Sequence, residues 1–129
     1  ADVSVNSRKE VTVHKVWAVA DFGYIHNLSA AENQIQGSVL DGLSQLMYAK
    51  ITFENAVIDQ GNFHQYPLIR NFQTPELDVA FLQPAGVSPT GSGEPGLPPA
   101  LPAIANAIFS ASGVRVRKAP LSELGYSLV

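Results

Sequence analysis

The segment Gly91–Pro99, with the sequence GSGEPGLPP, places a single carboxylate, that of Glu94, among three glycines and three prolines. Glycines let a ligand come close to the backbone because they carry no Cβ. Prolines restrict the loop and are favoured in the first turn of a following helix. A carboxylate held in such a loop is suited to act as a general base. A simpler interpretation, which the residue types alone favour, is that Glu94 offsets the positive end of the helix dipole.

Other kinds of site find little support in the sequence. Ser92 lies between two glycines but lacks the G-x-S-x-G spacing of a hydrolase nucleophile elbow. The glycines show neither Walker spacing nor the G-x-G-x-x-G pattern after a strand, which argues against a nucleotide-binding loop. His14, His26 and His64 do not pair with one another or with a carboxylate at metal-ligand spacing. We therefore assign no metal ligand to this chain.

The composition is that of one globular domain with a lightly charged surface. The chain has 129 residues, of which 46% are hydrophobic and 15% charged. Such a surface arises by chance or because other polypeptide covers part of it. The net charge of −3 gives no electrostatic reason to expect nucleic acid as a partner. The absence of cysteine excludes disulfides and iron–sulfur ligation by this chain. No apolar run approaches the length of a membrane span, so membrane insertion is not expected.

The apolar pattern predicts an α+β fold, a mixed sheet packed against two main helices. Strands are expected at Asp2–Val5, Val11–Phe22, Lys50–Val57, Glu76–Leu82 and Val114–Lys118. The second half of Val11–Phe22 is apolar on both faces, which predicts a central strand covered on each side. The aromatic residues Phe63, Tyr66 and Phe72 are expected to lie in the core or at an interface.

Two helices are expected on either side of the long loop Gln83–Pro99. Ser29–Glu32 has the pattern of a capping box, which predicts that the first helix begins at Ala30. The second is expected at Ala100–Ser112, buried on nearly all sides, with Gly113 as its C-terminal cap. In the first helix the core face is expected to comprise Leu28, Ala31, Ile35, Val39, Leu43 and Leu46, and a separate polar stripe Gln34, Ser38, Asp41 and Gln45.

Gly37 and Gly42 interrupt the first helix, each at a cost of about 1 kcal/mol relative to alanine. Glycines inside a helix are best tolerated where another backbone or a ligand must come close.

Four segments, taken in order, resemble the C-terminal part of the large subunit of the molybdenum hydroxylases, the xanthine dehydrogenase and aldehyde oxidase superfamily. The resemblance is closest to the isoquinoline 1-oxidoreductase beta-subunit branch, and its second and fourth segments are the most specific. The segments are AVADFGYIHN (Ala18–Asn27), NQIQGSVLDGLSQLMY (Asn33–Tyr48), GNFHQYPLIR (Gly61–Arg70) and GSGEPGLPPALPAIANAIFSASGVRVRKAPL (Gly91–Leu121).

The resemblance implies roles for particular residues. In that family the glutamate of the Gly-x-Gly-Glu-Pro loop lies beside molybdenum and acts as the general base, and here this residue is Glu94. Gln34 matches the glutamine that hydrogen-bonds the pterin, Gly37 permits close approach nearby, and Gly93 is expected to bind the cofactor as well. The implied cofactor is molybdopterin in its cytosine dinucleotide form, with molybdenum in the full enzyme.

The resemblance also implies that residues 1–129 are a single domain, the C-terminal part of the molybdopterin-binding region of a much longer subunit. The implied reaction is hydroxylation of an N-heteroaromatic or aldehyde carbon with oxygen derived from water. The implied partners are the remainder of the large subunit, a small [2Fe-2S] subunit and a small-molecule substrate.

The isolated chain is expected to be inactive and to bind no cofactor. We expect apolar or poorly ordered surfaces around Gly37 and Gly91–Gly96. The alternative is a binding or assembly domain that retains the fold without the chemistry.

Overall fold

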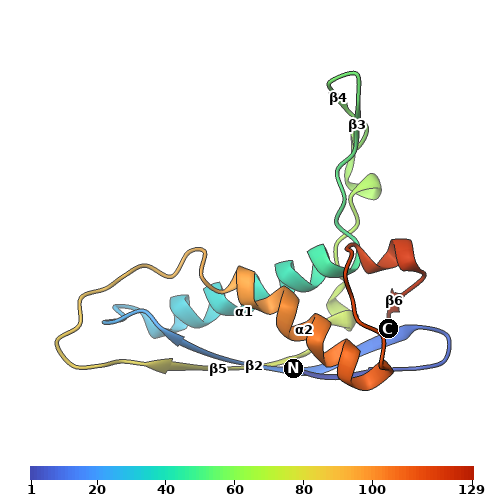
Figure 1. The fold of residues 1–129 in the computed structure, drawn as a ribbon. Helices are drawn as coiled ribbons and strands as arrows, with labels where there is room; N and C mark the ends of the chain where they lie inside the picture. Colours follow the sequence, from blue (N-terminus) through green and yellow to red (C-terminus); the bar gives the residue numbers. More distant parts are fainter.

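The computed structural model describes residues 1–129 as a four-stranded mixed sheet, a short two-stranded sheet and two long helices. This arrangement confirms the predicted α+β fold class. Both helices lie on the same face of the larger sheet (Figure 1). The elements are β1 (Asp2–Val5), β2 (Glu10–Asp21), α1 (Leu28–Met47), β3 (Phe53–Glu54), β4 (Val57–Ile58), β5 (Glu76–Leu82), α2 (Leu97–Ser112) and β6 (Ser127–Leu128), with 3₁₀ turns at Phe63–Gln65, Asn71–Gln73 and Leu121–Leu124.

β2 is the central strand of the larger sheet. β1 pairs with it in antiparallel orientation along one edge. β5 and β6 are both parallel to β2 and pair along its other edge. The core cluster lies between this sheet and the helices, and α1 and α2 also contact each other.

A β-bulge interrupts the pairing of β1 with β2. Val13 pairs with Val3, whereas Lys15 pairs with Asp2. His14 is therefore the extra residue on β2. Because side chains alternate along a strand, one additional residue exchanges the two faces beyond the bulge.

The bulge corrects one prediction. Before it Val11 and Val13 are buried, whereas beyond it Val16 is buried, and Trp17 and Val19 are 55% and 69% exposed. The second half of β2 is thus covered by the helices on one face only, and the prediction of a strand covered on both sides is wrong for this chain.

The predicted core face of α1 is confirmed except at its first residue. Ala31, Ile35, Val39, Leu43 and Leu46 are buried, whereas Leu28 is exposed. The helix begins at Leu28, because the side chain of Asn27 accepts a hydrogen bond from the Ala30 backbone N–H at 3.0 Å. Asparagine is as good an N-cap as serine, so the predicted start at Ala30 is wrong by two residues.

α2 begins three residues earlier than predicted, at Leu97, with two prolines in its first turn. Only Ala100, Ile104 and Ile108 are buried, so the prediction of burial on nearly all sides is wrong. The predicted cap is confirmed: Gly113 has a φ of 72° and its N–H donates to the Phe109 carbonyl oxygen at 2.8 Å.

Two of the predicted strands, Lys50–Val57 and Val114–Lys118, do not form as predicted. Lys50–Val57 contributes only to the short β3–β4 hairpin, which projects away from the helices and the larger sheet (Figure 1). Val114–Lys118 forms no strand. Instead Arg115 packs back on α2, with its guanidinium carbon 3.6 Å from the centre of the Phe109 ring and a 2.6 Å hydrogen bond to the Asn106 Oδ1. Alternation along the chain does not by itself supply the neighbouring strand that a sheet requires.

The aromatic side chains that follow the hairpin do not belong to the core, since Phe63 is 90% exposed and Phe72 81% exposed. Neither helix is long and apolar enough to cross a membrane.

Candidate functional site

The loop between β5 and α2, residues 83–96, is attached to the end of β2 by its backbone. The Thr90 N–H donates to the Phe22 carbonyl oxygen at 3.0 Å. Gly23 has a φ of 66°, and a Cβ there would lie 2.2 Å from the Ser88 carbonyl oxygen. Only glycine fits where the loop crosses the end of the strand.

The other end of the loop is attached to α1. The side chain of Gln34 donates from Nε2 to the Gly93 carbonyl oxygen at 2.7 Å. A Cβ on Gly96 would lie 2.9 Å from the Ser38 Cβ and 3.0 Å from the Ile35 Cδ1. Gly96 therefore allows the loop to lie directly against the helix that carries the polar stripe.

A cavity of about 410 Å³ lies where the loop meets α1. It is lined by Gln34, Gly37, Ser38, Asp41, Gly93, Glu94, Leu97 and Pro98. The structure thus brings together the four residues that the sequence singled out, although Gln34 and Gly93 are far apart in the chain. Glu94 is exposed, and none of the ion pairs of the chain involves its carboxylate.

Four of the six side chains that line this cavity are polar, and we call it the polar cavity. The Ser38 hydroxyl donates to the Gln34 carbonyl oxygen at 2.8 Å, and Asp41 accepts a hydrogen bond from Gln45 Nε2 at 3.1 Å. The polar stripe predicted on α1 supplies much of this lining, because three of its four residues face the cavity.

The two glycines within α1 have different surroundings. A Cβ on Gly42 would lie 3.0 Å from the Ala100 Cβ and 3.1 Å from the Leu101 Cδ1, so this glycine lets α1 and α2 approach closely. A Cβ on Gly37 would meet no atom within 4 Å. No packing within the chain explains Gly37, which borders open space in the cavity.

A second cavity, of about 390 Å³, adjoins the same loop and also includes Gln34. Tyr24 and His26 line it, with their rings edge to face at 4.8 Å between centroids. Reasoning from the sequence did not identify these two residues as part of a site. The signal available was their position in the segment Ala18–Asn27, which carries part of the family resemblance.

The titrating groups with displaced pKa values lie away from both cavities. A hydrogen bond to Glu76 raises the pKa of Lys15. A hydrogen bond from Lys50 lowers the pKa of Glu123. The chain contains no cluster of three or more His, Cys, Asp or Glu side chains that could hold a metal ion.

Comparison with known proteins identifies the family. Residues 1–75 match the molybdopterin cofactor-binding domains. The chain belongs to this family. It is 35% identical over 123 residues to the B subunit of nicotinate dehydrogenase from Pseudomonas putida, covering 95% of this chain and 10% of that protein. It is 29% identical over 115 residues to the beta subunit of isoquinoline 1-oxidoreductase from Brevundimonas diminuta, covering 89% of this chain and 15% of that protein.

The fold of this molybdopterin-binding domain agrees with that comparison. It matches quinoline 2-oxidoreductase from Pseudomonas putida 86 with a TM-score of 0.77 at 20% identity, covering 89% of this chain and 16% of that chain. The predicted resemblance to the xanthine oxidase family of molybdenum oxidoreductases is confirmed. The chain spans between a tenth and a sixth of the length of these three proteins.

The polar cavity fits a pterin in the chemistry of its groups. A pterin carries both hydrogen-bond donors and acceptors, and the cavity offers an amide, a hydroxyl and two carboxylates. Since Nε2 of Gln34 is bonded to Gly93, its Oε1 is oriented by that bond and is suited to accept a hydrogen bond from a ligand. The open space beside Gly37 leaves room for a ligand to contact the helix backbone.

Proposed function

We propose that residues 1–129 form a single domain, the C-terminal part of the molybdopterin-binding region of a larger molybdenum hydroxylase subunit, in which Glu94 is the general base. The observation that carries this proposal is the polar cavity, where Glu94 lies beside Gln34, Gly37 and Gly93. The proposed substrate is an N-heteroaromatic compound or an aldehyde, oxidised at an electron-poor carbon with oxygen from water. Relatives named for nicotinate and isoquinoline support the first class.

In this proposal the chain contributes proton transfer and positioning. The bound cofactor would supply the two-electron oxidation of the substrate. Glu94 accepts the proton that the water-derived nucleophile loses, which requires a carboxylate in a fixed position. Gln34 fixes that position, because its bond to the Gly93 carbonyl holds the residue immediately before Glu94 against α1.

The effect of Gln34 on cofactor retention tests this arrangement. In the complete subunit, Gln34→Ala removes the bond to Gly93 and a polar group facing the cavity. We expect molybdenum and pterin content to fall by roughly 10-fold or more, as when an outer-shell partner of a metal site is removed. The matched control is Gln36→Ala, on the same helix but outside the cavity. Equal cofactor content in the two variants would contradict the role of Gln34.

The isolated chain provides a second test. Because most of a family subunit lies outside residues 1–129, we expect the purified 129-residue protein to contain no stoichiometric molybdenum and to have no hydroxylase activity. Elemental analysis after expression in a host that makes the cofactor measures this directly. One molybdenum per chain would show that the domain binds the cofactor unaided.

Two finer features complete the proposal: the cytosine dinucleotide form of the cofactor and a small [2Fe-2S] subunit as electron-transfer partner. The names of the two relatives, each one subunit of an enzyme, support a multi-subunit assembly. Release of CMP on acid hydrolysis of the purified complex tests the first, and copurified iron tests the second.

A further inference from the structure

β2 is paired on only one edge over its second half. β5 pairs with Lys15–Asp21 along one side. On the opposite side β1 ends where Asp2 faces Lys15. Residues 16–21 of β2 therefore have an unpaired edge, with backbone N–H and C=O groups free to bind another strand.

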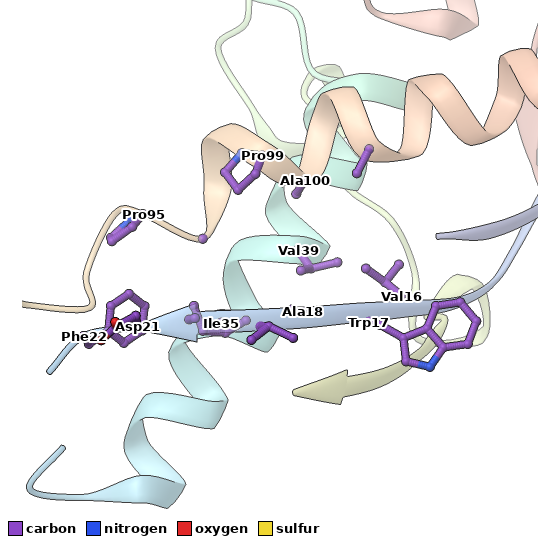
Figure 2. Close-up of a pocket in the computed structure, with 14 residues that line it drawn as sticks. Val16, Trp17, Ala18, Asp21, Phe22, Ile35, Val39, Pro95, Pro99 and Ala100 are labelled. Atoms are coloured by element: carbon purple, nitrogen blue, oxygen red, sulfur yellow. The ribbon is translucent and has the colours of Figure 1, made fainter. Parts of the chain in front are cut away.

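An apolar cavity of about 370 Å³ lies beside this edge, enclosed by β2, α1 and the first turns of α2. Figure 2 shows its lining, with Val16 and Ala18 on β2, Ile35 and Val39 on α1, and Pro99 and Ala100 on α2. Ten of its fourteen lining residues are hydrophobic, and Asp21 is the only charged one. It is suited to apolar side chains.

β1 occupies the equivalent position farther along the sheet. It pairs with the same edge of β2 and contacts α2. Val3 and Val5 pack against the core that includes Ile104 and Ile108 of α2. The apolar cavity lies along the N-terminal part of α2 and is the continuation of the space that β1 fills. Figure 1 places the N-terminus beside the sheet under α2, partway along β2.

We propose that polypeptide preceding Ala1 in the larger subunit continues β1 along the free edge of β2 and fills this apolar cavity. The inference rests on the proposed function, in which this chain is part of that subunit. Continuity favours this occupant, because a segment joined to Ala1 already lies in line with the edge, whereas a separate chain would have to enter beside the end of β1.

The register fixes which residues of this segment face the cavity. Extending the Asp2–Lys15 pair one residue at a time places the residue just before Ala1 opposite Trp17 and the third residue before Ala1 opposite Val19. The second and fourth residues before Ala1 then lie opposite Ala18 and Ala20, on the face toward the helices. The proposal requires apolar side chains at those two positions, and the small side chains of Ala18 and Ala20 leave room for them.

A disulfide trap in the complete subunit tests the register. Residues 1–129 contain no cysteine, so Val19→Cys introduces the only thiol of this region, to be combined with cysteine at the third position before Ala1. Directly opposite residues in an antiparallel pair lie within disulfide range. We expect this pair to be linked after mild oxidation, as seen by mass spectrometry of the digested subunit. The matched control, Ala18→Cys with the same upstream cysteine, places the thiols on opposite faces and should stay unlinked.

Absence of the link in the Val19→Cys pair, or linkage of the control to the same extent, would overturn the proposal. A covalent dimer through the thiol that Val19→Cys introduces would overturn it too, by assigning the edge to a second copy.

Hydrogen exchange on the unmodified subunit tests the proposal even if the cysteine variants do not fold. Amides of residues 16–21 should exchange as slowly as those of residues 11–15, and rapid exchange of every second amide would refute the strand. Molybdenum content separates the two proposals. A disulfide link in a subunit without molybdenum contradicts the proposed function alone. Full molybdenum content without the disulfide link contradicts only the proposal that the upstream segment forms a strand along β2.

Discussion

Replacing Glu94 by glutamine in the complete subunit is expected to slow reduction of the enzyme by its substrate at least ~100-fold, the lower range for a lost general base. Glutamine keeps the size of the side chain and much of its hydrogen bonding but removes the basic carboxylate. No ion pair of the chain involves Glu94, so the substitution leaves no unpaired charge. Molybdenum content and unfolding free energy should therefore remain close to those of the wild type. Rapid-mixing kinetics on the metal-replete variant measure the effect.

The structure also weakens the interpretation that Glu94 only offsets a helix dipole. α2 begins at Leu97 with Gly96 as its N-cap and has no acidic residue in its first turn. Glu94 lies two residues before that cap, and the dipole effect, about 0.3–1 kcal/mol, decays within the first turn. A suitable control is Glu32→Gln, in the first helix and outside both cavities. A near-normal reduction rate in Glu94→Gln, with a stability loss instead, would support the dipole interpretation and remove Glu94 from the mechanism.

The sequence predicted the elements that are defined by their own periodicity. The apolar run of β2 and the alternation of β5 indicate two strands, and the helical spacing on α1 indicates a helix and its buried face. The bulge at His14 was not predicted, because it depends on how β1 pairs with β2. The strand expected at Val114–Lys118 was wrong for a related reason. Alternation indicates a possible strand, and the fold decides whether another strand lies beside it.

The candidate site was predictable to a similar extent. Helical spacing placed Gln34, Ser38 and Asp41 on one face, and the glycines and prolines marked the loop around Glu94. The contact that joins these two parts, from Gln34 to Gly93, spans 59 residues of sequence, and no local pattern encodes it. The roles given to Glu94 and Gln34 come from the family resemblance, and the experiments above test them.

Gly37 and Gly42 allow a sharp test of the polar cavity, because the same substitution should have opposite effects on stability at the two positions. Leucine is a much better helix former than glycine, by nearly 1 kcal/mol. At Gly37 the added side chain meets no atom of the chain at its Cβ, whereas at Gly42 it meets Ala100 and Leu101 of α2 at 3.0 and 3.1 Å. Gly37→Leu should therefore leave the unfolding free energy unchanged or raise it by up to about 1 kcal/mol, and Gly42→Leu should lower it by about 1–3 kcal/mol through overpacking.

Gly37→Leu should weaken cofactor binding, although it does not lower the unfolding free energy. If a pterin lies against α1 at this position, the leucine side chain occupies its space, and an overpacking cost of about 1–3 kcal/mol weakens binding by roughly 5- to 150-fold. We expect the complete subunit carrying Gly37→Leu to be folded, at least as stable as the wild type, and depleted of molybdenum and pterin. Urea unfolding and elemental analysis on the same preparation give both quantities. In Gly42→Leu any loss of cofactor should accompany the loss of stability, since Gly42 packs against α2 and does not line the cavity. A stable Gly37→Leu subunit with full molybdenum content would show that the cofactor does not occupy this cavity. The polar stripe of α1 would then face space that no ligand needs.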